Sequence, residues 1–166
     1  MVFSDEHPDI IGIRRMVPAD VPAVAAMDRA SDPDAWTENI FRRELQVSLS
    51  HNLVAVGKTA QGDWIAGFIV FWMAADELQL HKIVVSPQAR RRGVARRLFQ
   101  AMTDQALACG LSRATLEVRR ANESAIKLYE AFGYRVAAVR KGYYVETGED
   151  ALIMCARLRP APVGAV

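Results

Sequence analysis

The chain has 166 residues, of which 51% are hydrophobic and 24% charged, with 21 Lys+Arg against 19 Asp+Glu. This composition is typical of one soluble globular domain with a sizeable core, and it excludes a disordered chain. The formal net charge of +2 gives no global signature of a nucleic-acid or membrane partner.

Cysteine usage and the N-terminal sequence indicate a reducing compartment. Cys109 and Cys155 lie far apart with no metal-ligand spacing, so we expect reduced, mostly buried thiols rather than a disulfide. No secretory signal is visible, and the longest apolar run, 64–75, is too short to span a bilayer. We therefore expect a cytoplasmic protein with no membrane partner.

Hydrophobic periodicity and turn residues predict alternating strands and helices. Strands are expected at 9–16, 53–56, 64–73, 76–85, 115–119, 134–144 and 151–158. Helices are expected at 17–30, from Thr37 to about 48, at 91–109 and at 122–132. The sequence shows no internal repeat and no sign of a second domain.

One predicted helix joins two strands that we expect to be parallel. Strand 78–85, helix 91–109 and strand 114–119 form a crossover unit within a mixed α/β sheet. Ligands bind such sheets where the carboxyl ends of the strands separate, and Val85 and Arg119 lie at such ends.

An arginine cluster follows the first strand of this crossover. Five of the 21 Lys+Arg lie between Arg90 and Arg97. A helix N-terminus carries a charge of roughly +0.5, so cations there are unfavourable unless an anion such as phosphate binds. Gly93 and Ala95 would let backbone N–H groups approach phosphate oxygens. A solvated basic helix start and a nucleic-acid patch are the alternatives.

Three polar residues that follow have plain structural interpretations as well as functional ones. Glu117 shares a strand face with Arg119, so it is either ion-paired, with Arg119 or with a residue on another strand, or a general base whose pKa is raised by partial burial. Asn122 is a suitable helix N-cap, and Tyr129 lies on an apolar stripe typical of a core.

Histidine and tryptophan add little to the functional argument. His7, His51 and His81 have no ligand spacing, so no metal site is expected. The tryptophans, taken alone, are expected in the core.

Together these residues resemble a known superfamily. Arg90-x-x-Gly93-x-Ala95, preceded by Ile83-Val84-Val85, is similar to the Q/R-x-x-G-x-G/A pyrophosphate loop of the GNAT acyltransferases. Segment 116–134 is similar to the RimI-type N-terminal acetyltransferases, which acetylate the N-terminal alanine of a small-subunit ribosomal protein. Trp36-Thr37 is similar to that family's Pro-Trp-Ser, with Ala35 replacing the proline.

The resemblance implies a GNAT-like α/β fold with a mixed, mostly antiparallel central sheet, a parallel crossover and helices on both faces. It implies one acetyltransferase domain at 9–158, between a flexible N-terminus, 1–8, and a flexible tail, 159–166. Acetyl-CoA would be the co-substrate, with no metal. The partner would be a peptide or protein N-terminus, with a ribosomal protein favoured and no direct nucleic-acid contact.

The resemblance also implies residue roles. Glu117 would be the general base and Tyr129 the general acid. Contacts to the co-substrate would come from Ile83, Val84, Val85, Arg90, Arg91, Arg92, Gly93, Val94, Ala95, Arg96 and Asn122. Contacts to the acceptor would come from Trp36, Tyr143, Tyr144 and Glu149.

Three alternatives stay open at this stage. The chain could be a GNAT enzyme acting on a small amine or a lysine side chain, because Ala35 departs from the RimI-type pattern. It could be a nucleic-acid-binding module that uses the arginine cluster, or a GNAT protein that binds acyl-CoA without catalysis.

Overall fold

The computed structural model describes residues 9–160, so the predicted flexible segment 1–8 and most of the predicted tail lie outside the described residues. The described elements are β1 (Asp9–Arg15), η1 (Pro18–Asp20), α1 (Val21–Ser31), α2 (Glu38–Glu44), β2 (Ser50–Thr59), β3 (Gly62–Ala74), β4 (Glu77–Val85), η2 (Pro87–Ala89), α3 (Val94–Ala108), β5 (Arg113–Arg119), α4 (Glu123–Ala131), β6 (Arg135–Tyr144) and β7 (Glu149–Arg157).

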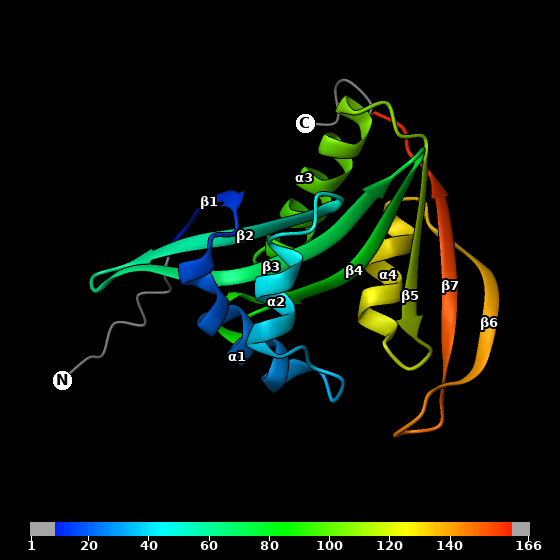
Figure 1. Cartoon of the computed structure of the whole chain (residues 1–166), viewed down its shortest axis with the longest axis horizontal. Coiled ribbons are helices and arrows are strands. Elements are labelled where there is room, and N and C mark those ends of the chain that lie inside the picture. The colour runs from blue at the N-terminus through cyan, green and yellow to red at the C-terminus, as the bar shows by residue number, and fades with distance from the viewer. Residues whose placement is uncertain (1–8, 161–166) are drawn as a thin grey trace. The chain divides into compact units, whose positions relative to one another are not determined.

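The chain divides into two compact units. The first contains the described residues up to Val70 together with Lys82–Ala101, and the second contains Phe71–His81 and the residues from Met102 onward. Strands β3 and β4 and helix α3 each run from one unit into the other (Figure 1).

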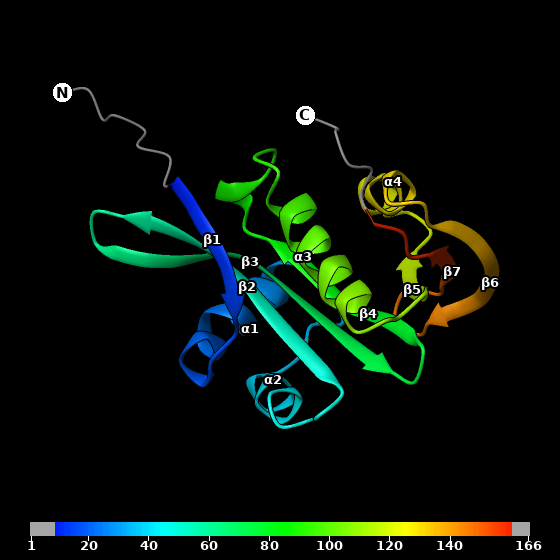
Figure 2. The ribbon, with the colours of Figure 1, turned by 90° about the horizontal axis from the view of Figure 1, so that it is seen from above.

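In the first unit the strands are hydrogen-bonded in the order β1-β2-β3-β4. Helices α1 and α2 cover one face of these strands, and the first turns of α3 lie on the other (Figure 2). Helix α1 buries Val21, Val24, Ala25 and Asp28, which recur at the helical period and so form one face. The core between these helices and the strands includes Phe41, Val54 and Phe68.

In the second unit the strand order is β4-β5-β7-β6. Strand β4 is parallel to β5, pairing Glu77–Leu80 with Arg113–Leu116, while β7 is antiparallel to both β5 and β6. Helix α4 begins at its cap Asn122, whose side chain accepts the Ala125 N–H at 3.3 Å. The mixed, mostly antiparallel sheet with its parallel crossover and helices on both faces is therefore confirmed.

Two local predictions were wrong. The third long helix begins at Val94 rather than Arg91, because Arg91 and Gly93 have φ values of +59° and +73°, which an α-helix cannot contain. Cys109 is exposed rather than buried; both cysteines are free thiols, as expected. Between residues 9 and 160, no helix is long and apolar enough to cross a membrane.

Candidate active site

The arginine-rich turn, residues 90–93, lies between η2 and α3 in the first unit. Its ends are fixed by burial, since Ala89 and Val94 are buried while Arg90, Arg91, Arg92 and Gly93 are exposed. Ser86 anchors the preceding strand, because its N–H donates to the Ala66 carbonyl at 2.9 Å. The turn is thus held firmly at both ends, with its backbone open to solvent.

The backbone of this turn has the geometry of an anion cradle. Left-handed residues at Arg91 and Gly93 alternate with neighbours of other conformations, and such alternation directs successive N–H groups to one side. The first hydrogen bond of α3 joins the Arg97 N–H to the Gly93 carbonyl at 3.0 Å. The N–H groups of Val94 and Ala95 therefore lie in the first turn of α3, before the helical hydrogen-bond ladder begins.

These donors fit the pyrophosphate that the sequence predicts. Several N–H groups and a helix N-terminus form a standard site for a phosphate group. Because α3 begins at Val94, Arg90, Arg91 and Arg92 lie before the helix and can supply supporting charge around a backbone site. The predicted contacts of Arg90, Arg91, Arg92 and Arg96 to a ligand stay predictions.

A glycine on β3 brings strand β4 close to this cradle. A Cβ atom at Gly67 would lie 2.8 Å from the Val84 carbonyl oxygen and 3.3 Å from side-chain carbons of Val94 and Leu98. Only glycine therefore allows this approach. Gly67 therefore helps to fix the backbone of Val84, which belongs to the segment Ile83–Val85 that we expect to bind the pantetheine arm.

The last residues of β4 lie beyond its pairing with β5, which covers Glu77–Leu80. Backbone groups of Ile83, Val84 and Val85 on that edge can therefore accept an added strand-like ligand. Asn122 acts in the structure as the cap of α4, and its exposed side chain leaves the predicted ligand contact as a prediction.

Glu117, on β5 in the second unit, is held by two groups from β6. Its carboxylate forms an ion pair with Arg140 at 3.0 Å, and its side chain is 35% exposed. Tyr143 donates a hydrogen bond to Glu117, and this bond raises the pKa of the Tyr143 phenol. Arg140 also stacks over the Tyr143 ring, 5.4 Å from its centroid. Of the two predicted ion pairs, the structure contains the cross-strand one, with Arg140 on β6 as the partner.

Tyr129, on α4, is 5% exposed, as predicted from its apolar stripe. Burial raises the pKa of its phenol well above the ordinary value of 10.0, and Tyr144 adds to the effect. The phenol therefore keeps its proton at neutral pH and can donate a hydrogen bond to a developing anion.

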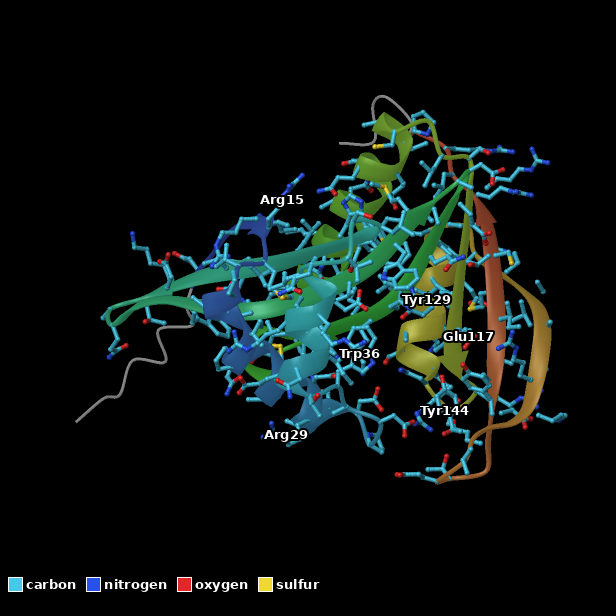
Figure 3. All side chains as sticks on the ribbon, in the orientation of Figure 1. Arg15, Arg29, Trp36, Glu117, Tyr129 and Tyr144 are labelled. Atoms are coloured by element: carbon cyan, nitrogen blue, oxygen red, sulfur yellow. The ribbon has the colours of Figure 1, made fainter. Side chains whose placement is uncertain are left out.

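A tyrosine pair connects these two groups. The rings of Tyr143 and Tyr144 meet edge to face at 5.2 Å, Tyr143 contacts Glu117, and Tyr144 interacts with Tyr129. Figure 3 labels Glu117, Tyr129 and Tyr144 on β5, α4 and β6. The predicted base, the predicted acid and two predicted acceptor-binding residues are thus joined within one unit.

Glu149 supports this group from β7. It forms an ion pair with Arg119 at 3.3 Å and accepts the Ala121 N–H at 3.0 Å. The Arg119 guanidinium lies 3.7 Å from the Tyr144 ring centroid. Glu149 therefore orients Arg119 against Tyr144, a structural role that the sequence did not reveal.

Trp36, in the first unit, lies between α1 and α2 and is half-buried against the core. Its ring centroid is 5.4 Å from that of Phe41, and its backbone N–H donates to Asp28 at 2.7 Å. Thr37 caps α2 as predicted, accepting the Ile40 N–H at 3.4 Å. The core interpretation of Trp36 is confirmed in part, and its contact to an acceptor stays a prediction.

A cavity of about 500 Å³ lies elsewhere in the second unit, at the start of β5 and the end of β7. It is lined by Glu77, Arg113, Ala114, Thr115, Gly133, Cys155, Ala156 and Arg157. None of the predicted site residues lines it. In the described part of the chain, no group of three or more His, Cys, Asp or Glu side chains could hold a metal ion.

A backbone turn suited to a phosphate in the first unit, and a carboxylate joined to a buried phenol in the second, are features expected of an acyl-CoA-dependent transferase. The model of the acetyltransferase (GNAT) family matches residues 21–134, and the chain belongs to this family.

Its relatives include N-terminal acetyltransferases. Ribosomal protein bS18-alanine N-acetyltransferase of Escherichia coli K12 is 33% identical over 142 residues, which cover 81% of this chain and 89% of that protein. The crystal structure of the ribosomal-protein-S18-alanine N-acetyltransferase from Escherichia coli matches with a TM-score of 0.78 and 28% identity, covering 93% of this chain and 98% of that one. Ard1 from Thermoplasma volcanium matches with a TM-score of 0.77 and 25% identity, covering 90% and 98% of the two chains.

Proposed function

We propose that this protein transfers the acetyl group of acetyl-CoA to the α-amine at a protein N-terminus, and that its acceptor is the N-terminal alanine of ribosomal protein bS18. The observation that carries the reaction is the group Glu117–Tyr143–Tyr144–Tyr129, in which a carboxylate and a protonated phenol are joined. The acceptor is supported by the activity for which the Escherichia coli relative is named. A ribosomal acceptor implies a cytoplasmic enzyme, and we propose that its catalytic domain spans residues 9–158.

The co-substrate would be held mainly by backbone groups. The N–H groups around Gly93 and Ala95 would bind the pyrophosphate, and the free edge of Ile83–Val85 would bind the pantetheine arm. Because these donors are fixed by the fold, they are oriented before the ligand arrives, which lowers the cost of binding.

The chemistry is direct attack of the amine on the thioester. The amine nitrogen forms a bond to the acetyl carbon, the C–S bond breaks, and coenzyme A leaves as a thiolate. Glu117 takes the proton that the attacking nitrogen loses, directly or through one water. The Tyr129 hydroxyl donates a hydrogen bond to the departing sulfur and stabilises its charge as it develops.

The acceptor class agrees with a single carboxylate base. An α-amine has a pKa of about 7.7–8.0, so roughly a tenth of it is neutral at pH 7. A lysine amine, with a pKa of about 10.4, is neutral roughly 400-fold less often. One carboxylate base therefore suffices for an α-amine, whereas a lysine amine requires a much larger shift in its protonation equilibrium.

The experiment is a mass-spectrometric acetylation assay with acetyl-CoA and two peptides. One begins with the alanine of bS18, and the other has a blocked N-terminus and a free lysine. We expect acetyl on the α-amine of the first peptide only. Acetylation of lysine alone would overturn the proposed acceptor.

Two variants test the roles of the acid and the base. Glu117→Gln and Tyr129→Phe should lower kcat by about 10²-fold or more while acetyl-CoA still binds. Tyr134→Phe is the matched control, because Tyr134 is also buried and its ring centroid lies 6.3 Å from that of Tyr129. Glu130→Gln on the exposed side of α4 controls for loss of a carboxylate. Wild-type kcat in Glu117→Gln and Tyr129→Phe across pH 6–9 would refute the assignment.

A further inference from the structure

Lys82 is a buried cation held between two carboxylates in the first unit. Its side chain is 9% exposed, and its ammonium lies 3.0 Å from an Asp28 carboxylate oxygen and 3.1 Å from Asp32 Oδ2. It also donates to the Asp34 carbonyl at 3.4 Å. The Asp28 side chain is completely buried. Removing Lys82 alone would leave the buried Asp28 carboxylate without its cation.

These contacts fix the loop between α1 and α2 at several points. Asp28 lies on α1, while Asp32 and Asp34 lie in the loop itself. Asp28 also accepts the Trp36 backbone N–H at 2.7 Å, and the Lys82 ammonium lies 5.5 Å from the centroid of the Trp36 ring. One lysine therefore contacts both ends of the loop and the aromatic side chain that it carries.

Stability alone does not account for this arrangement. A buried ion pair replaced by apolar residues of similar volume is often as stable or more so, because desolvation offsets the Coulombic attraction. Charged contacts do, however, fix one geometry where apolar contacts would permit several. Lys82 is also the residue immediately before Ile83–Val85 on β4. It thus joins the α1–α2 loop to the strand that we expect to bind acetyl-CoA.

We infer that Lys82 is a positioning residue for the acceptor: with Asp28 it holds Trp36 and the α1–α2 loop in the conformation that recognises the acceptor. This inference rests on the proposed function, in which Trp36 contacts the acceptor. The inference predicts an effect on one substrate only. Loss of the Lys82–Asp28 pair should weaken acceptor recognition and leave acetyl-CoA binding unchanged.

The test is the double variant Lys82→Met/Asp28→Asn, which removes both charges while keeping the side-chain volumes similar. The amide introduced by Asp28→Asn retains a carbonyl oxygen for the Trp36 N–H, and no unpaired charge is left to unfold the core. We expect KM for the acceptor to rise about tenfold or more, because small displacements of a positioning group have effects of that order. The Kd for acetyl-CoA should stay within about twofold of wild type, and kcat within about threefold.

A second ion pair in the same unit is the matched control. The guanidinium of Arg14, on β1, lies 2.7 Å from the carboxylate of Asp20, which ends η1 and precedes α1. The variant Arg14→Met/Asp20→Asn should change stability without changing KM for the acceptor. Hydrogen exchange at the Trp36 amide should rise in the single variant Lys82→Met and stay unchanged in the Arg14/Asp20 variant.

The outcomes separate this inference from the proposed function. The acetylation assay with the wild-type enzyme first establishes which amine is acetylated. KM for that amine is then measured for the variant and for the wild type, and the two values are compared. An unchanged acceptor KM in Lys82→Met/Asp28→Asn would overturn the role of Lys82. An equal rise in acceptor KM and acetyl-CoA Kd, or an equal rise in the control variant, would overturn it as well.

Discussion

Gly93 offers the sharpest test of how the phosphate cradle works. Its φ of +73° is a conformation that costs an L-residue about 1–2 kcal/mol, although a Cβ there would meet no atom within 4 Å. Gly93→Pro adds a second defect, because proline fixes φ near −65° and has no N–H. A lost N–H bond to a charged phosphate weakens binding by about 1.5–3 kcal/mol, or about 10–150-fold in Kd.

Arg91→Ala should weaken binding less. The arginine is exposed, and an exposed ion pair contributes about 0.2–1 kcal/mol, so the Kd for coenzyme A should rise less than about sixfold. That smaller loss should shrink further at high salt, because exposed charges are screened. The effect of Gly93→Pro should persist in salt, since it arises from the shape of the backbone.

Gly110→Ala is the control for backbone strain. Gly110 follows the other end of α3 with φ +80° and also has open space around its Cβ position. Gly93→Ala and Gly110→Ala should therefore lower Tm by similar amounts, about 2–4 °C for each kcal/mol lost. Only the change at Gly93 should weaken coenzyme A binding in calorimetric titrations. If Arg91→Ala weakens binding more than Gly93→Pro, the arginines and not the backbone hold the pyrophosphate.

Three further changes test other parts of the site. Glu117→Gln replaces the carboxylate whose hydrogen bond and charge raise the pKa of Tyr143 with a neutral amide, so the phenol should titrate at lower pH in a tyrosinate absorbance titration, with Tyr143→Phe assigning the signal; an unchanged titration would contradict this interaction. The pKa of Asp150 is lowered by the Gly142 N–H, Lys141 and Arg120, so its stabilising contribution is present above the ordinary pKa and is lost as pH falls through the lower folded-state value. Asp150→Asn should therefore destabilise the fold at pH 7 and have no effect in strong acid, and a pH-independent difference in urea unfolding would contradict this. Gly67→Ala forces a Cβ against the Val84 carbonyl and should cost about 1–3 kcal/mol and weaken coenzyme A binding, whereas Gly12→Ala, with open space, should leave that binding unchanged.

The order of elements was predictable because each element carries its own local signal. Thr37 and Asn122 are capping residues, and both accept the N–H groups expected of them. The crossover of β4, α3 and β5 followed from an apolar strand, a periodic helix and a second strand, and the parallel pairing confirms it. Periodicity could not locate the start of α3, because arginine is a good helix former. Only the left-handed φ values of Arg91 and Gly93 show that residues 91–93 lie before the helix.

The partner of Glu117 could not be predicted for a different reason. Strand β6 carries irregularities in its register with β7 between Val136 and Ala138 and again between Arg140 and Tyr144. Each irregularity changes which side chains share a face, so simple alternation fails across residues 136–144. The sequence showed a carboxylate that needed a partner, and the structure supplies both Arg140 and Tyr143.

Lys82 and Asp28 are separated by 54 residues, and each is ordinary in its own element. Asp28 falls on the buried face of α1, which was the one available signal, because a carboxylate at a core position requires a cation. Nothing local identified which of the 21 Lys+Arg supplies that cation. Once identified, the pair explains how a loop that departs from the RimI-type pattern at Ala35 can still hold a defined shape: the Trp36 N–H is fixed by a buried carboxylate, and that carboxylate is fixed by a lysine on β4.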